Sequence, residues 1–258
     1  MRSIRFIYHL WLVADFFIVA YWIRFTTFNP VLRRQRYVAN TSRISRKFLK
    51  AFRINLNIKN EQALRALKES PYLLVANHTS YLDVILLASL ENLSFITSVE
   101  MGNNYFLGPI TRMGGSLFTN RKKPVSLKKE IENFSTAIDN GFKVVLFAEG
   151  TSTNGVTVKA FRSSLFQIAV NTSCPILPVC IKYKSLDSQP ISPDNRDLIY
   201  WYGEMDFAPH FMKLLDRRIG AEIEILDSVV QIEGKTRAEL SNEVFQRIHQ
   251  CYHAEAQK

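Results

Sequence analysis

The stretch 72–90 changes from an apolar run to a polar turn and then to a second apolar run. The first run, 72–76, follows Pro71 and has the length and composition of a strand that is buried on both faces. The polar turn covers 77–83, and the second run, 84–90, is expected to be a helix. Because a buried strand that leads directly into a helix is the unit of α/β domains, this stretch constrains the fold of the whole chain.

The same alternation of apolar runs and amphipathic segments continues from residue 60 to the end of the chain. Strands are expected near 72–76, 94–98, 115–119, 144–147, 176–183, 198–202 and 221–227, and helices near 61–69, 84–90, 104–112, 126–140, 163–171, 208–215 and 237–252. The order predicts an α/β fold with a mixed, largely parallel sheet flanked by helices, and with an N-terminal membrane-associated helical pair. In such sheets, functional side chains gather beyond the carboxyl ends of the strands.

The first helix of the expected pair is an apolar run at residues 6–23, bracketed by Arg5 and Arg24. As a helix it would be about 27 Å long, slightly shorter than the hydrocarbon core of a bilayer. Asp15, near its centre, would cost about 2.5–3.5 kcal/mol on insertion. No convincing cleavage site of a secretory signal peptide follows the run. We therefore expect a retained membrane helix that either spans the bilayer or enters one leaflet.

Residues 41–54 predict a second, amphipathic helix. Its apolar and basic residues fall on opposite sides at helical spacing: Ile44, Phe48, Ala51 and Phe52 against Arg43, Arg46, Lys47, Lys50 and Arg53. A purely cationic polar face beside an apolar helix favours a helix at the membrane interface over a solvated helix packed on the domain. We therefore expect residues 1–56 to form a membrane anchor and residues 57–258 to form the α/β domain.

The basic excess of the chain lies in this anchor. Residues 1–53 hold 11 of the 33 Lys and Arg residues and one acidic residue, and basic and acidic residues balance in the remainder. Because the basic residues flank an apolar run, we expect membrane lipids as partners and no nucleic acid. Cys174, Cys180 and Cys251 are widely spaced and match neither a disulfide framework nor a metal site. Reduced thiols and no bound metal are expected.

His78 and Asp83 are the candidate catalytic residues in the polar turn. A histidine where a strand ends, and a carboxylate five residues later at the start of a helix, can form a general base and its orienting group. One imidazole nitrogen would take a proton from a substrate hydroxyl while the other donates to the carboxylate. The alternative is an ordinary capped turn, with Ser80 as the helix cap and His78 merely exposed.

Four segments resemble the conserved boxes of the 1-acylglycerol-3-phosphate and lysophospholipid acyltransferases, and they occur in that family's order. Residues 77–83 (Asn-His-Thr-Ser-Tyr-Leu-Asp) resemble the first, His-x4-Asp box, and residues 115–121 resemble the second, which ends in an arginine. Residues 147–151 resemble the third, Glu-Gly-Thr box, and residues 175–179 resemble the fourth. Four short motifs in order are far more specific than one.

The resemblance implies direct transfer of a fatty acyl group from an acyl thioester to the hydroxyl of a lysophospholipid such as 1-acylglycerol-3-phosphate. His78 would be the general base and Asp83 would hold the imidazole, so neither Ser80 nor a cysteine need form an acyl-enzyme. No cofactor is expected beyond the donor, which is acyl-CoA or acyl carrier protein. The implied substrate-binding residues are Asn77, Ser80, Arg121, Glu149, Gly150, Thr151 and Arg162.

Three of these residues also have physical reasons to bind a lipid head group. The guanidinium of Arg121 matches a phosphate or another anion, although it could equally be a solvated arginine at the rim. Gly150 would let the backbone come close to a ligand. Glu149 would contact the glycerol portion of the acceptor or brace the site, and a salt bridge to Arg121 is the competing assignment.

One departure from the family pattern bears on the acceptor. The third box of the family commonly ends in arginine, whereas this chain has Ser152, which weakens the case for 1-acylglycerol-3-phosphate. Arg162 lies where a basic residue could compensate. Other lysolipids, such as lyso-ornithine lipid, therefore remain possible acceptors.

Two further classes of function are remoter alternatives. A lipid hydrolase of the α/β-hydrolase type would need a G-x-S-x-G nucleophile elbow, which is absent. A non-catalytic membrane adaptor would explain the basic N-terminus but not the polar boxes. We expect a membrane-associated enzyme at the cytoplasmic face of the inner, or plasma, membrane.

Overall fold

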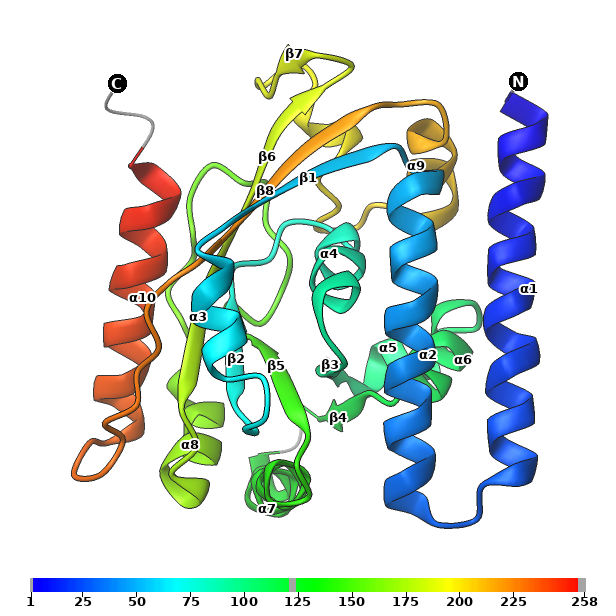
Figure 1. Cartoon of the computed structure of the whole chain (residues 1–258). Helices are drawn as coiled ribbons and strands as arrows, with labels where there is room; N and C mark the ends of the chain where they lie inside the picture. The colour runs from blue at the N-terminus through cyan, green and yellow to red at the C-terminus, as the bar shows by residue number, and fades with distance from the viewer. Residues whose placement is uncertain (1, 121–123, 255–258) are drawn as a thin grey trace.

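The computed structural model describes residues 2–120 and 124–254. Its centre is a mixed sheet with helices on both faces (Figure 1), in the strand order β1-β8-β6-β2-β5-β3-β4, with β7 paired to β6. The strands are β1 (Ile54–Lys59), β2 (Leu73–Ala76), β3 (Leu93–Ser98), β4 (Leu117–Thr119), β5 (Lys143–Phe147), β6 (Ile176–Leu186), β7 (Gln189–Pro190) and β8 (Ile219–Ile225).

The α-helices include two long ones at the N-terminus and one at the C-terminus. They are α1 (Arg2–Thr26), α2 (Pro30–Ala51), α3 (Glu61–Ala66), α4 (Leu82–Leu90), α5 (Val99–Asn103), α6 (Leu107–Met113), α7 (Leu127–Asp139), α8 (Gln167–Thr172), α9 (Phe207–Leu214) and α10 (Arg237–His253). Short 3₁₀ turns occur at Pro124–Ser126, Ser163–Phe166 and Arg196–Leu198.

The central strands run parallel, which confirms the predicted fold class. β2 pairs in parallel with β5 on one side and with β6 on the other, and β3 pairs in parallel with β5 and β4. β8 is antiparallel to β6 and carries β1 parallel to itself. The carboxyl ends of the central parallel strands therefore meet at one edge of the sheet.

β2 is buried on both faces because its side chains alternate between two apolar clusters. Leu74 and Ala76 belong to the cluster that includes residues of α4, whereas Leu73 and Val75 belong to the cluster that includes residues of α7 and α10. The continuous apolar run in the sequence thus reflects one strand shared by two cores, as expected for a central parallel strand.

The N-terminal helices form layers on the α4 side of the sheet. α2 packs on α4, and α1 packs on α2 (Figure 1). Asn29 caps α2 by accepting hydrogen bonds from the Val31 and Leu32 amides, so the helix begins at Pro30 and the predicted helix 41–54 is its second half. Ile44 of α2 is buried in a cluster with residues of α1. The expectation that the apolar side of 41–54 faces the membrane is therefore wrong, because this side packs against protein.

Asp15 of α1 forms ion pairs with α2, which lowers the free-energy cost expected for inserting its charge into a membrane. Its carboxylate oxygens lie 2.8 Å from Arg43 Nη1 and 2.7 Å from Lys47 Nζ, both on α2. The amide of Asn40 also donates to the Phe16 carbonyl across the same interface at 3.1 Å. Two basic residues of the predicted cationic side of α2 thus neutralise the acid on the neighbouring helix.

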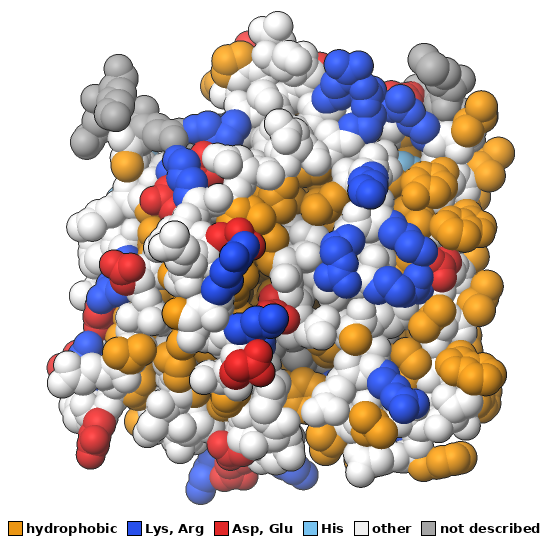
Figure 2. Space-filling view, viewed as in Figure 1, with side chains coloured by type: hydrophobic (Ala, Val, Ile, Leu, Met, Phe, Trp, Pro, Cys, Tyr) orange, Lys and Arg blue, Asp and Glu red, His pale blue; other side chains and the backbone are white. Residues whose placement is uncertain are grey.

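The outer side of α1 carries a row of exposed apolar side chains. Among the described residues, α1 is the one helix long and apolar enough to cross a membrane, over Ile4–Thr26. Its Ile18 and Trp22 side chains are 69% and 68% exposed, although its inner side is buried against α2. Figure 2 shows hydrophobic side chains along the edge of the molecule formed by α1, with Lys and Arg side chains gathered over the neighbouring α2.

Three details differ from the predicted elements. β1 lies across the expected boundary at residue 56 and joins the sheet beside β8. The helix predicted at 104–112 is present as α6 (Leu107–Met113), and an unpredicted short helix, α5 (Val99–Asn103), precedes it. The strand predicted at 198–202 is wrong: the Ile199 carbonyl accepts from the Ser80 hydroxyl and the Trp201 amide donates to the Thr79 carbonyl. The backbone of this segment therefore bonds to the polar turn and not to the sheet.

Candidate active site

The polar turn between β2 and α4 brings His78 and Asp83 into contact, as predicted. The His78 Nδ1 lies 2.9 Å from the Asp83 Oδ2. The Asp83 side chain is fully buried, whereas 18% of the His78 side chain is exposed. The histidine thus presents one edge to the surface, and its orienting carboxylate lies beneath it.

Asp83 also organises the turn that carries it. Its Oδ2 accepts the backbone amides of Thr79 at 2.7 Å and Ser80 at 2.9 Å, at the N-terminus of α4, where a negative charge is favoured. Its Oδ1 accepts the hydroxyl of Tyr183 at 2.7 Å. Because a carboxylate can only accept, the His78 Nδ1 carries a proton, and Nε2 of the neutral ring is left with a free electron pair.

The His78 ring is held from the side by Phe147, the last residue of β5. The two ring centroids are 4.1 Å apart and the ring planes differ by 15°. The His78 carbonyl accepts the Thr153 amide at 2.9 Å, which fixes the backbone of the turn. No role was predicted for Phe147, although its place at the start of the third box, at the end of a predicted strand, was a signal.

The third box meets the first because of the strand register. Ala76 pairs with Phe147 across β2 and β5, so His78 and Glu149 both lie two residues beyond the paired positions. The Glu149 Oε1 accepts the His78 amide at 2.7 Å, and its Oε2 accepts the Lys159 amide at 2.8 Å. Both Glu149 oxygens thus hold backbone amides, an arrangement that matches the bracing role. Contact with the acceptor and a salt bridge to Arg121, the other assignments made from the sequence, stay predictions.

Burial raises the pKa of Glu149. Its side chain is 4% exposed, and this burial raises its pKa to about 7, although the two amide hydrogen bonds act in the opposite direction. A group of this kind is expected near a functional site, because its protonation is sensitive to neighbouring charge.

Thr151 and Arg162 are exposed beside the third box, and Gly150 lies buried between them and Glu149. Gly150 has a φ of +78°, and a Cβ atom there would lie 3.0 Å from the Arg162 Nε. The Arg162 amide donates to the Ala148 carbonyl at 2.9 Å, which places the exposed arginine beside this turn. Thr151 is also exposed. The arrangement leaves a hydroxyl and a cation available next to Glu149, and their roles toward a substrate stay predictions.

Arg121 lies outside the described residues, so its predicted role stays a prediction. The end of the second box is anchored up to that point. The Glu130 carboxylate of α7 accepts the Thr119 hydroxyl at 2.6 Å and the Asn120 amide at 3.0 Å. The strand expected at 115–119 is present as β4.

Asn77 and Ser80 are buried and their side chains bind the protein itself. The Asn77 amide group exchanges two hydrogen bonds with the backbone of Ile181, at 2.9 and 2.8 Å, and so continues the β2–β6 pairing beyond the end of β2. The Ser80 hydroxyl donates to the Ile199 carbonyl at 2.8 Å. This geometry gives both side chains a structural role and does not support substrate binding by either.

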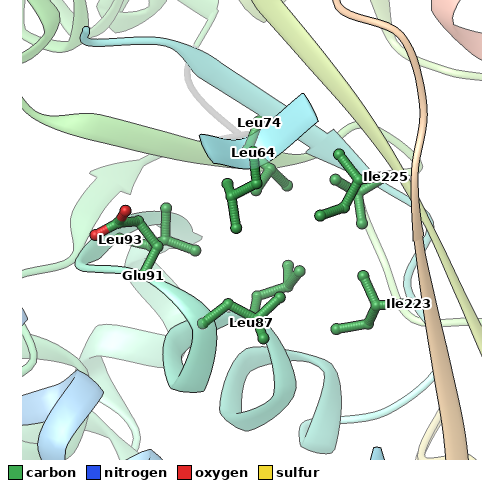
Figure 3. Close-up of a pocket in the computed structure, with 9 residues that line it drawn as sticks. Leu64, Leu74, Leu87, Glu91, Leu93, Ile223 and Ile225 are labelled. Carbon is green, nitrogen blue, oxygen red and sulfur yellow. The ribbon is translucent and has the colours of Figure 1, made fainter. Parts of the chain in front are cut away.

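A separate apolar cavity lies between α4 and the sheet. It is small, with a volume of about 10 Å³, and is lined by Leu64, Leu74, Leu87, Leu90, Glu91, Leu93, Val179, Ile223 and Ile225. Figure 3 shows the Leu64, Leu87, Ile223 and Ile225 side chains turned toward this space. His78 and Asp83 do not line it, so it is not the reaction site. Within the described residues no cluster of three His, Cys, Asp or Glu side chains could hold a metal ion.

Replacing Asn77 by alanine should lower stability and leave acceptor binding unchanged. The substitution would remove both partners of the buried Ile181 backbone groups, at a cost of about 1–3 kcal/mol. Denaturant unfolding and the acceptor KM of the folded variant measure the two effects, with the exposed Asn92→Ala as the control. A raised KM at unaltered stability would instead identify Asn77 as a substrate-binding residue.

Replacing Glu149 by glutamine should alter how stability depends on pH. The folded pKa of about 7 exceeds the ordinary value of 4.5, so the wild-type contribution is fully present below pH 4.5 and is lost as pH rises through 7. The advantage of wild type over Glu149→Gln should therefore shrink by up to about 3 kcal/mol across that window. Unfolding free energies of both proteins from pH 4 to 8 test this, and a constant difference would contradict it.

Comparison with known proteins supports the resemblance seen in the boxes. Residues 55–182 match the family model described as Acyltransferase. The chain resembles the lyso-ornithine lipid O-acyltransferases of Rhizobium meliloti, with 25% identity over 70% of this chain and 65% of the relative, and of Rhodobacter capsulatus, with 31% identity over 58% and 54%. It also resembles the 1-acyl-sn-glycerol-3-phosphate acyltransferase of Neisseria gonorrhoeae, with 29% identity over 43% and 44%.

The alignments thus span about half to two thirds of the curated relatives' length. A crystal structure of the 1-acyl-sn-glycerophosphate acyltransferase PlsC from Thermotoga maritima has a similar fold over the whole chain. The TM-score is 0.65, the sequence identity is 19%, and the match covers 100% of this chain and 99% of PlsC. Residues 55–182 therefore belong to the Acyltransferase family, and the fold of the chain is that of PlsC.

Proposed function

We propose that this protein is a membrane-associated acyltransferase that moves a fatty acyl group from an acyl thioester to the free hydroxyl of a lysolipid. The observation that carries the proposal is the contact of 2.9 Å between His78 and the buried Asp83, at the carboxyl end of β2. A base that is held in one tautomer at this edge of the sheet is what removal of a proton from an alcohol requires.

The transfer exchanges the carbon–sulfur bond of the thioester for a carbon–oxygen bond at the donor carbonyl, without an acyl-enzyme. The His78 Nε2 accepts the hydroxyl proton while the hydroxyl oxygen attacks the carbonyl carbon of the thioester. The carbon–sulfur bond then breaks, and the departing thiolate takes the proton from the imidazolium. Asp83 accepts the Nδ1 hydrogen throughout and stabilises the ring while it is charged. A thioester is reactive enough that no enzyme nucleophile is needed.

The favoured acceptor is lyso-ornithine lipid, and 1-acylglycerol-3-phosphate is the second candidate. Ser152 supplies no cation at the end of the third box, where phosphate recognition would benefit from one. The two lyso-ornithine lipid relatives also align over more of this chain, 70% and 58%, than the Neisseria relative does, at 43%. Arg121 and Arg162 are the proposed contacts for the anionic part of either acceptor, and acyl-CoA or acyl carrier protein is the proposed donor, with no further cofactor.

The outer side of α1 is the proposed contact with the bilayer, at the cytoplasmic face. Its exposed apolar side chains continue for most of the helix, and basic residues of α2 lie beside it (Figure 2). Both features favour a surface with anionic lipids. Because the inner side of α1 packs on α2 and also contacts α6 and α9, the hairpin would enter the lipid with that side still covered by protein.

Replacing His78 by alanine should reduce acyl transfer by about 10²–10⁴-fold, the usual contribution of a general base, and should leave the fold intact. Purified protein is incubated with acyl-CoA or acyl carrier protein donors and with each of the two lysolipids, and ester and free fatty acid are quantified. His249→Ala, on α10, is the control. Release of free fatty acid alone would indicate a hydrolase, and a fully active His78→Ala protein would refute the role of the base.

Replacing Ile18 and Trp22 together by glutamate should release the protein from vesicles. The two exposed side chains lie one turn apart on the outer side of α1, so both charges would face lipid. Val230→Glu is the matched control, since that side chain is 67% exposed elsewhere on the surface. Vesicle co-sedimentation measures binding, and transfer to a detergent-dispersed acceptor checks that the site survives. Undiminished vesicle binding would place the anchor elsewhere.

A further inference from the structure

The buried carboxylate of Asp83 has a partner far away in the sequence. Tyr183 lies on β6, in the part of that strand that extends beyond its pairing with β2. Its hydroxyl donates to the Asp83 Oδ1 at 2.7 Å, whereas His78 and the two turn amides all donate to Oδ2. Within the described residues Tyr183 is thus the one hydrogen-bond donor to Oδ1.

We infer that Tyr183 is a positioning residue of the acyl transfer, whose hydroxyl fixes the Asp83 carboxylate and limits its pull on the His78 Nδ1 hydrogen. The inference rests on the proposed function, because it assigns the task of Tyr183 within that reaction. It acts through Asp83, since the distances join the tyrosine to the carboxylate and not to the histidine ring.

The surroundings of Tyr183 suit a permanent donor. The side chain is buried, and its ring packs edge-on against Tyr200 with centroids 5.8 Å apart. Burial and the neighbouring Asp83 charge raise the pKa of the Tyr183 hydroxyl well above its ordinary value. The hydroxyl therefore keeps its proton at every pH at which the enzyme would work, and donates to Asp83 throughout.

Removing this donor should strengthen the hold of Asp83 on a protonated His78. A carboxylate that has lost a hydrogen bond is more basic, so it stabilises the imidazolium more and the histidine stays protonated up to a higher pH. Three other described titratable groups lie close enough to Asp83 for its charge to raise their pKa values: Glu149, Tyr200 and Tyr252. Tyr183, Tyr200 and Tyr252 have raised pKa values and stay neutral. Glu149, with a pKa of about 7, is the one of these groups that changes charge near neutral pH, so its effect on the pH–rate profile must be measured as well.

The first test compares Tyr183→Phe with Tyr72→Phe. Both remove one hydroxyl from a buried tyrosine, but the Tyr72 hydroxyl has no partner in the described part of the chain. For Tyr183→Phe we expect kcat about 10-fold lower at neutral pH, unchanged KM for donor and acceptor, and an acid limb of the pH–rate profile shifted upward by roughly half a unit. Tyr72→Phe should match wild type. An equal loss at all pH values, with no shift of the limb, would overturn the inference.

A double-mutant cycle shows whether Tyr183 acts through Asp83. In an Asp83→Asn background, the further change Tyr183→Phe should cost little more activity, because the carboxylate that it serves is gone. A loss of the same size in both backgrounds would mean that the tyrosine acts by packing alone. Repeating the profile in Glu149→Gln separates any contribution of that carboxyl to the acid limb.

A measurement independent of catalysis separates this inference from the proposed function. Nitrogen-15 labelling of the five histidines, with His78→Gln to assign the His78 signals, follows the His78 ring by NMR as pH is varied. An upward shift of its titration in Tyr183→Phe supports the inference even if wild type transfers no acyl group, a result that would refute the proposed function alone. An unshifted titration would overturn the inference whatever the activity.

Discussion

A buried carboxylate must be compensated where it lies, and Asp83 is compensated by four hydrogen bonds that come from two separate stretches of the chain, the polar turn and β6. Two amides of the turn, the His78 ring and the Tyr183 hydroxyl converge on its two oxygens. The turn between β2 and α4 takes its shape from these bonds, and the imidazole takes its direction from the turn. Local backbone geometry and candidate chemistry therefore depend on the same charge.

The parallel register of the sheet extends this local arrangement to the third box. Because Ala76 lies opposite Phe147, two loops that begin at the same level of the sheet place Glu149 under the backbone of His78 and Phe147 against its ring. β6 contributes twice, since its backbone receives Asn77 and its far half supplies Tyr183. Three adjacent strands thus shape one histidine, although the residues involved are up to about 100 positions apart in the chain.

Sequence patterns predicted the elements and contacts that depend on burial or on residues close together in the chain. The apolar run of β2, the amphipathic period of α7 and the pairing of His78 with Asp83 follow from neighbours in the chain. Hydrogen-bond partners across the fold leave no such pattern, so the roles of Asn77 and Tyr183 were not foreseen. The wrongly predicted strand at 198–202 has the same origin. An apolar run indicates that a segment is buried, but it does not indicate the hydrogen-bond partners of the segment's backbone.

The layering of α1 on α2 and of α2 on α4 has a consequence for substrate choice. Asp83 is the second residue of α4, so a column of packed helices joins the proposed lipid-facing side of α1 to the carboxylate that holds the His78 imidazole. The ion pairs of Asp15 with Arg43 and Lys47 hold α1 in a fixed register on α2. If α1 enters the bilayer as proposed, this column sets the depth of His78 relative to the lipid, and only acceptors whose hydroxyl lies at that depth would reach its Nε2.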